Sequence, residues 1–305
     1  MKAVDITDYL FQKRIEYEYK GDNQIEIQTI SSLGNITNNS ICWIKNKKYA
    51  TYEVIDKICS TGSVLVVCPF EIEGTNCLIT QYPKAVFFDI LNKFFSKDFS
   101  HNISDKATVL TEKIGNNVHI GANCYIGEEV IIGDNTIIHP NVTIMSPCSI
   151  GHDCEIFPGV VIGSDGFGYY FEGDIPYREK HFKGVIIGNH VDIGSNTNID
   201  RGLITDTVIG NNTKIDGLCK IGHNVIIEDN CLIIACSVLC GSAQIKKNSY
   251  IAPNSTVLNQ VTVGNYAKVG VHSVAMKNVR DGATIMGVPG EEFLPQIMYK
   301  GGKNE

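Results

Sequence analysis

Aliphatic residues recur at every sixth position through the middle and the second half of the chain. A first run extends in six-residue steps from Ile114 to Ile162, a second from Ile187 to Ile199, and a third from Ile209 to Val269. None of the residues at these in-phase positions is charged. A fixed short period of this kind is the signature of a solenoid, in which each repeat packs only on its neighbours.

A second position in each repeat, two residues before the aliphatic one, holds a small or β-branched residue. Residues i and i+2 of a strand point to the same side, so each hexapeptide is predicted to be a short strand with two inward side chains, followed by a turn. The pattern predicts a mainly β fold, a parallel β-helix with three hexapeptides in each triangular coil. Five cysteines occupy the second position and are expected to fill the core: Cys124, Cys148, Cys154, Cys219 and Cys231.

Two interruptions break the register. Residues 164–184 are rich in glycine, aromatic and charged residues, and a shorter insertion lies near residues 201–207. A long loop in a compact repeat is expected to cover a functional site or contact a partner. Both interruptions are therefore stronger functional indications than residues inside the coils.

The flanking segments lack the six-residue period. Residues 1–100 are predicted to form a small α/β domain, with helices over 5–14 and 83–95 and strands over 24–30 and 63–70. Residues 96–106 are polar and typical of a linker. The division expected is an α/β domain at 1–100, a β-helix at 107–275 with the 164–184 insertion, and a short C-terminal tail at 276–305.

Composition narrows the function class. The chain has 305 residues and a formal net charge of −7, which disfavours a nucleic-acid partner. It contains no apolar run long enough for a transmembrane segment, and its first residues do not resemble a signal peptide. Eleven cysteines without a C-x-x-C pair are typical of reduced thiols. These features predict a cytoplasmic protein.

Two of the eight histidines stand out as candidates for chemistry. His152 and His223 each follow an aliphatic–glycine pair, on a turn where an imidazole reaches solvent or a groove between subunits. Gly241 lies three hexapeptides after His223, so a regular coil would place it directly above, leaving space for a slender ligand. The same count from His152 leads to Tyr170, inside the insertion. The other histidines, His181 and His190 among them, are expected to be ordinary surface or turn residues.

Five motifs resemble those of the hexapeptide-repeat acyltransferases, and within them the UDP-3-O-acylglucosamine N-acyltransferases of lipid A synthesis. The matching segments are SICWIKNKKY (40–49), GSDGFGY (163–169), IDRG (199–202), DTVIG (206–210) and KIGHNV (220–225). The resemblance extends from the N-terminal domain to about residue 290. It implies a left-handed β-helix, a homotrimer, and three active sites in grooves between neighbouring subunits.

The resemblance also implies roles for individual residues. His223 corresponds to the catalytic base, which takes a proton from the attacking amine. Trp43 and Tyr49, with Asn46 nearby, correspond to the aromatic pair that stacks on the uracil of a UDP-linked amino sugar. That pair makes the N-terminal domain a uridine-binding domain. Asp216 and Gly241 are expected to bind substrate.

Two departures from the family leave the acyl donor open. Gln260 stands where the family has a second active-site histidine that holds the oxyanion, and glutamine can donate a hydrogen bond but carries no charge. The C-terminal tail is short and resembles that of coenzyme A-dependent sugar acetyltransferases. Acyl-coenzyme A and acyl carrier protein are both possible donors, with a slight preference for coenzyme A, and no metal is expected.

The alternative hypothesis is a protein without acyltransferase activity. It would be a structural β-helix trimer, or a carbonic-anhydrase-like relative that has lost its metal. The carbonic-anhydrase version would need several histidines converging on one metal between subunits. The KIGHNV segment and the aromatic pair favour the N-acyltransferase instead.

Overall fold

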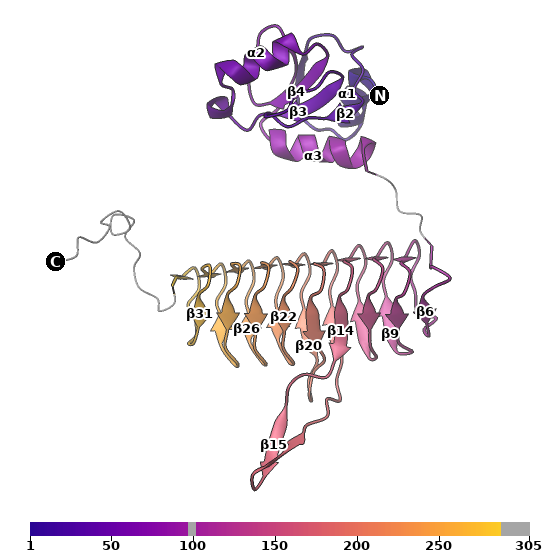
Figure 1. Ribbon diagram of the computed structural model, residues 1–305, viewed down its shortest axis with the longest axis vertical. Coiled ribbons are helices and arrows are strands. Elements are labelled where there is room, and N and C mark those ends of the chain that lie inside the picture. The colour runs from indigo at the N-terminus through magenta and orange to yellow at the C-terminus, as the bar shows by residue number, and fades with distance from the viewer. Residues whose placement is uncertain (97–101, 288–305) are drawn as a thin grey trace, which may run out of the picture. The chain divides into compact units, whose positions relative to one another are not determined.

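The computed structural model of the protein describes residues 1–96 and 102–287 (Figure 1). Contacts divide the chain into two compact units, Met1–Asp98 and Phe99–Glu305. Residues 97–101 of the expected linker and residues 288–305 of the expected tail lie outside the described residues. Among the described residues, no helix is long and apolar enough to cross a membrane.

The N-terminal unit is an α/β fold built on one five-stranded sheet, in the order β1–β5–β4–β3–β2. Strand β1 is antiparallel to β5, and the other neighbours are parallel. Its elements are α1 (Ala3–Gln12), β1 (Glu18–Lys20), β2 (Thr29–Ile30), β3 (Ser40–Trp43), the 3-10 helix η1 (Lys47–Tyr49), α2 (Tyr52–Ser60), β4 (Val64–Cys68), β5 (Asn76–Ile79) and α3 (Pro83–Phe94).

Strand β4 explains why helices lie on both faces of this sheet. All of its residues are buried, so neither face can be left to water. Leu65 and Val67 join the apolar cluster that includes residues of α1 and α3, whereas Val64, Val66 and Cys68 join a second cluster with residues of α2. The alternation along one strand thus fixes the three-layer arrangement.

The predicted elements of this unit are largely present. The helices expected over 5–14 and 83–95 correspond to α1 and α3, and the strand expected over 63–70 corresponds to β4. The strand expected over 24–30 is wrong for most of its length, because only Thr29–Ile30 form a strand. Ile25 and Ile27 are buried, but their backbone atoms bond to Ala3 and Met1. The alternation of apolar and polar residues at 24–28 therefore reflects the burial of Ile25 and Ile27, and these residues form no regular ladder of strand hydrogen bonds.

The second unit is a parallel β-helix whose short strands form three sheets (Figure 1). The first sheet contains β7 (His119–Ile120), β10 (Ile137–Ile138), β13 (Glu155–Ile156), β18 (Asp192–Ile193), β21 (Lys214–Ile215), β24 (Leu232–Ile233), β27 (Tyr250–Ile251), β30 (Lys268–Val269) and β32 (Thr284–Ile285). The second contains β6 (Thr108–Val109), β8 (Tyr125–Ile126), β11 (Thr143–Ile144), β14 (Val161–Ser164), β19 (Asn198–Asp200), β22 (Lys220–Ile221), β25 (Val238–Leu239), β28 (Thr256–Val257) and β31 (Val274–Ala275). The third contains β9 (Val130–Ile132), β12 (Cys148–Ile150), β17 (Val185–Ile187), β20 (Thr207–Ile209), β23 (Ile226–Ile227), β26 (Gln244–Ile245) and β29 (Thr262–Val263).

The strand register shows where the two insertions leave the coil. Ile138 pairs with Ile156, the equivalent position one coil of three hexapeptides further along. Ile156 pairs with Ile193, and Ile193 with Ile215, so two consecutive coils are longer than three hexapeptides. The longer insertion forms an antiparallel hairpin, β15 (Tyr169–Glu172) and β16 (Ile175–Arg178), which projects from the coil (Figure 1). The coils continue past residue 275, because β32 pairs with β30.

The interior of the β-helix follows the two inward positions of the repeat. Its core contains stacked aliphatic residues, and the five cysteines predicted to fill it are all buried. Burial raises the pKa of Cys148 to about 12 and the pKa of Cys219 and Cys231 to about 11, so these thiols stay protonated. The prediction that they are core residues is confirmed.

The turns of the coil recur in one backbone conformation. Asn residues such as Asn224, Asn230 and Asn248 adopt a positive φ of 60°, the left-handed region that asparagine tolerates well. Asp153, with φ of 54°, and His190, with φ of 56°, take the same conformation. The side chains at these left-handed positions are partly or fully exposed, and most of them are polar.

Candidate active site

His223 lies at the corner between the second and third sheets, directly after β22 and before β23. Its side chain is partly exposed. A depression of ≈ 630 Å³ lies beside it, lined by Phe167, Gly168, Tyr169, Phe171, Pro176 and Glu179 of the insertion. The insertion therefore forms a wall next to this imidazole, as the sequence led us to expect of a covering loop.

Asn224 determines which nitrogen of His223 can accept a proton. Its Nδ2 donates to the carbonyl oxygen of Thr205 (2.6 Å) and to Thr205 Oγ1 (2.7 Å), which fixes the orientation of the amide. Asn224 Oδ1 therefore faces His223 Nδ1 at 2.9 Å, and it also accepts from the N–H of Leu203 (3.2 Å). An amide oxygen can only accept, so Nδ1 carries the proton and Nε2 has the free lone pair.

Gly241 lies one coil further along, against the Nε2 side of the imidazole. The Ser242 N–H donates to the carbonyl oxygen of His223 (2.9 Å), which shows that the two turns are stacked. A Cβ atom at Gly241 would lie 2.6 Å from His223 Nε2. Any side chain here would collide with the nitrogen that has the free lone pair, so the missing Cβ keeps that atom accessible.

The start of the insertion contacts His223 from another side. A Cβ atom at Gly166 would lie 3.0 Å from His223 Cδ2 and 3.1 Å from His181 Nε2. The rings of His181 and His223 meet edge to face, with centroids 5.2 Å apart. His181 is 6% exposed, and its Nε2 has no hydrogen-bond partner among the described residues. His181 Nε2 is therefore a buried polar atom without a partner, covered by the backbone at Gly166 beside His223.

An ion pair between the buried Asp200 and the half-exposed Lys220 lies next to the start of the insertion. The carboxylate of Asp200 is almost fully buried and pairs with Lys220 Nζ, which also donates to Asn198 Oδ1. Asp200 Oδ1 accepts from Ser164 Oγ (3.4 Å), and a Cβ atom at Gly166 would lie 3.1 Å from Asp200 Oδ2. These bonds tie the first residues of the insertion to β19 and β22, so the loop backbone is held at the site.

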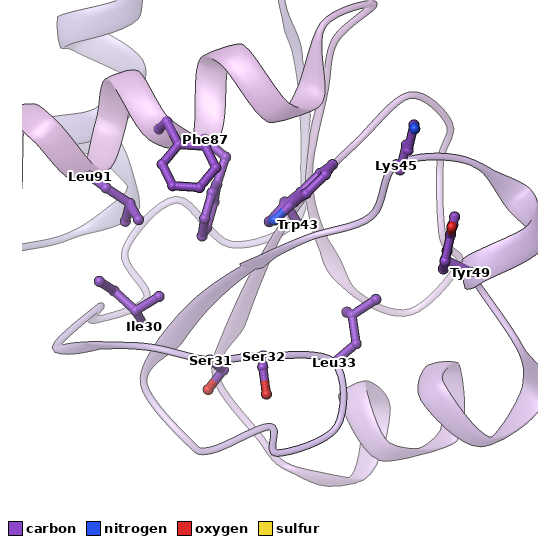
Figure 2. A pocket seen from close by; sticks show the side chains of 10 residues that line it. Ile30, Ser31, Ser32, Leu33, Trp43, Lys45, Tyr49, Phe87 and Leu91 are labelled. Carbon is purple, nitrogen blue, oxygen red and sulfur yellow. The ribbon is translucent and has the colours of Figure 1, made fainter. Parts of the chain in front are cut away.

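A second pocket lies in the N-terminal unit and has a volume of ≈ 550 Å³. Trp43, Tyr49 and Phe87 line it together with Lys45, Leu91, Leu33, Ile30, Ser31, Ser32 and Phe88 (Figure 2). Trp43 ends β3, and ligands of parallel sheets bind beyond the carboxyl ends of strands. The two aromatic residues predicted to clamp the uracil thus border one pocket. The ring of Trp43 also packs on Phe87, with centroids 6.3 Å apart.

Asn46 has a positioning role in this pocket. Its side chain is exposed, and Oδ1 accepts from the N–H of Lys48 at 3.0 Å. This bond caps the 3-10 helix η1, which carries Tyr49. Asn46 therefore holds the turn that places Tyr49 at the pocket, and its role in binding substrate stays a prediction.

Gln260 and Asp216 are not brought to His223 by contacts within the described part of the chain. Gln260 is exposed on a left-handed turn, and its N–H donates to the carbonyl oxygen of Gly241. Asp216 lies at the corner between the first and second sheets, where its carboxylate accepts from the N–H groups of Gly217 and Ala235. The predicted roles of both residues are untested by these contacts.

Sequence reasoning missed several side chains at this site. His181 was expected to be an ordinary loop residue, but the fold buries it against His223. Asn224, Asp200 and Lys220 lie inside the matching segments KIGHNV and IDRG, yet no role was predicted for them. The position of these three residues within the matching motifs could have indicated that they belong to the site. No feature of the sequence could have indicated His181, because the insertion has no repeat from which its position could be predicted.

Comparison with known proteins agrees with the repeat and the motifs. The family described as "Bacterial transferase hexapeptide (six repeats)" matches residues 113–145, 129–164 and 206–241. The UDP-3-O-acylglucosamine N-acyltransferase of Campylobacter lari is 34% identical to this chain, and the alignment covers 94% of this chain and 92% of that protein. The chain belongs to the UDP-3-O-acylglucosamine N-acyltransferase family.

Other relatives match over part of their length. A probable mitochondrial UDP-3-O-acylglucosamine N-acyltransferase of Arabidopsis thaliana is 38% identical over 159 residues, which is 50% of this chain and 52% of that protein. Among solved structures, the UDP-N-acetylglucosamine acyltransferase of Francisella novicida superposes with a TM-score of 0.57 at 28% identity. That match covers 62% of this chain and 68% of that one. The second unit of this member of the UDP-3-O-acylglucosamine N-acyltransferase family is thus a left-handed β-helix.

Proposed function

We propose that this protein is an N-acyltransferase that transfers an acyl group from a thioester to the amino group of a UDP-linked 3-O-acylglucosamine. The product would serve lipid A or a related surface glycan. The proposal rests on the membership of this chain in the UDP-3-O-acylglucosamine N-acyltransferase family. The observation that supports it at the site is the arrangement of His223, whose Nδ1 is held by Asn224 while Gly241 leaves Nε2 open.

The chemistry requires one base and space for two substrates. The amine attacks the thioester carbonyl and its proton passes to His223 Nε2. The tetrahedral intermediate then collapses to an amide as the carbon–sulfur bond breaks, and the imidazolium returns the proton to the departing sulfur, which leaves as the thiol. A neutral imidazole suits this step near neutral pH and is worth about 10² to 10⁴ in rate. Gln260 is proposed to donate a hydrogen bond to the oxyanion, in place of a second histidine.

The N-terminal pocket is proposed to bind the nucleotide. The uracil would stack between Trp43 and Tyr49, the Asn46-capped turn would hold Tyr49 in place, and Lys45, which lines the same pocket, would attract the diphosphate. Asp216 and Gly241 are proposed to contact the rest of the substrate. The donor is proposed to be acyl-coenzyme A or acyl carrier protein, and no metal is proposed for the reaction.

We also propose that the protein is a homotrimer that works in the cytoplasm. The strand residues of the insertion hairpin are all exposed in the single chain, including Phe171 at 68% and Ile175 at 58%. Exposed apolar residues of this kind are typical of a surface that another subunit or a substrate covers. The free cysteines suit a reducing compartment.

The proposal is tested by replacing the base. His223→Ala should lower turnover by about 10² to 10⁴ and leave the trimer intact by size-exclusion chromatography. His272→Ala is the control, because His272 is an exposed histidine on another turn of the coil, and it should retain wild-type turnover. Near-normal activity of His223→Ala would contradict the assignment of the base.

A further inference from the structure

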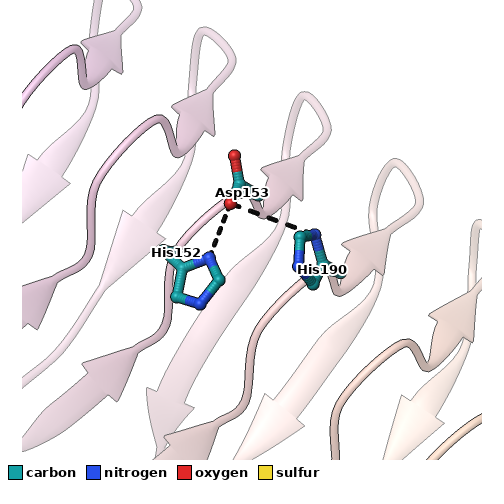
Figure 3. Close-up of side chains that lie close together, drawn as sticks. All are labelled: His152, Asp153 and His190. Carbon is teal, nitrogen blue, oxygen red and sulfur yellow. Dashed lines mark hydrogen bonds and ion pairs between the residues drawn. The ribbon is translucent and has the colours of Figure 1, made fainter. Parts of the chain in front are cut away.

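His152, Asp153 and His190 form a cluster of metal-ligand side chains at a corner of the β-helix that His223 does not share (Figure 3). His152 follows β12 and His190 follows β17, so the cluster lies between the third and first sheets. His223 lies between the second and third sheets, directly after β22. The cluster is therefore separate from the acyl-transfer site proposed around His223.

The fold brings these residues together across the long insertion. The expectation that Tyr170 lies one coil above His152 is wrong, because the insertion lengthens this coil. Strand β12 pairs directly with β17, and the His190 N–H donates to the carbonyl oxygen of His152 (3.0 Å). Two histidines on opposite sides of the insertion in sequence thus occupy adjacent turns.

The geometry of the cluster is close to that of a coordination site. Asp153 Oδ2 lies 2.5 Å from His152 Nδ1 and 4.0 Å from His190 Nδ1, between the two imidazoles (Figure 3). The three candidate ligand atoms all lie within 4.8 Å of one another. Tetrahedral zinc with bonds of about 2.0 to 2.2 Å requires ligand atoms about 3.3 Å apart. The three side chains are exposed, so small rotations can reach that spacing.

The electrostatics favour a cation. Asp153 contributes an exposed carboxylate oxygen between the two imidazoles, and carboxylate oxygens are common ligands of divalent metal ions. Lys214 donates to the carbonyl oxygen of His190, but its charge is balanced by Asp192 at 2.9 Å. Two imidazoles and one carboxylate are the ligands of many zinc sites, with water in the fourth position.

We propose that His152, Asp153 and His190 bind a divalent first-row transition ion, zinc in the first instance, which links the two coils on either side of the insertion. The ion replaces the hydrogen bond between His152 and Asp153 and fastens β12 to β17 at this corner. This site is independent of the acyl transfer proposed for His223, and its test does not use enzyme activity.

The test is a calorimetric titration of the full chain with Zn²⁺ after removal of metals with a chelator. Wild-type protein should bind one Zn²⁺ per chain, and zinc should raise its Tm. His190→Gln should weaken Zn²⁺ binding by about tenfold or more and remove the zinc-dependent rise in Tm. Glutamine suits this turn, because Gln260 adopts the same left-handed conformation.

His272→Gln is the matched control, since His272 lies on an equivalent turn with φ of 55°. It should bind zinc as the wild type does. The proposal is overturned if wild-type protein does not bind zinc. It is also overturned if His190→Gln binds zinc with unchanged affinity, because the ion would then sit on other groups, such as the exposed thiols of Cys59 and Cys236.

Discussion

Asn224 is a neutral side chain that orients the imidazole of His223, the proposed base. It occupies a left-handed turn for which asparagine is well suited, and the same residue then uses its amide to bridge Thr205 and His223. An aspartate would stabilise a charged imidazolium, whereas an amide oxygen only selects the tautomer and orients the ring. Asn224 is therefore a positioning residue for His223, the group proposed to meet the substrate.

Asn224→Gly should lower kcat by about tenfold while KM stays close to the wild-type value, because the lost hydrogen bond is worth about 1 to 1.5 kcal/mol. Glycine keeps the left-handed backbone, so the turn itself is preserved. Steady-state kinetics measures the split between kcat and KM. Asn230→Gly, on a turn with the same φ, is the control and should behave as wild type. An unchanged kcat in Asn224→Gly would exclude the orienting role.

Trp43→Ala should act on binding and not on the chemical step. Loss of one base-stacking contact of about 1 to 3 kcal/mol predicts a rise in KM for the nucleotide sugar of about fivefold to 150-fold. Trp43→Phe keeps a stacking face and should lose much less. Because Trp43 packs on Phe87, Tm must be measured for both variants. Equal KM values for wild type and Trp43→Ala would place the uracil elsewhere.

At the scale of elements, the six-residue period was enough to predict the coil. The strands of the β-helix core place aliphatic residues inward, and small residues such as Cys124 and Cys154 fill the second position. The insertion could not be predicted in the same way, since it has no repeat and its hairpin has no buried face. For this reason the burial of His181 and the meeting of His152 with His190 became visible only in three dimensions.

The coil should fold without the insertion hairpin. The coil strands on both sides of it pair directly, β12 with β17 and β14 with β19. Replacing residues 169–178 by a short glycine–serine turn should therefore leave the circular dichroism spectrum and the Tm near those of the wild type. It should also lower turnover by about 10² or more, because the wall of the depression beside His223 is lost.

Two outcomes of this replacement would contradict the role proposed for the hairpin. Wild-type turnover after the replacement would show that residues 169–178 are not part of the site. Loss of the folded state would show that the hairpin supports the coil, contrary to the strand pairing described above.

At the scale of the whole molecule, the chain combines a pocket lined by aromatic residues with a histidine on a rigid solenoid. The family and the fold were predictable from the sequence, because the repeat and five motifs extend over most of the chain. Substrate choice was less predictable, since the residues proposed to govern it, such as Gln260 and Asp216, are outward side chains that the repeat does not constrain. In the proposed homotrimer, assembly would set their positions relative to a neighbouring subunit, and the repeat does not encode that assembly.

The most direct test of the account is a product analysis. Purified protein would be incubated with UDP-3-O-acylglucosamine and, in separate reactions, acetyl-coenzyme A or hydroxyacyl carrier protein, and the products would be analysed by mass spectrometry. We predict the mass of one added acyl group on the amine with wild-type protein and its loss with His223→Ala. No acylation with either donor, or equal acylation by wild type and His223→Ala, would contradict the central claim.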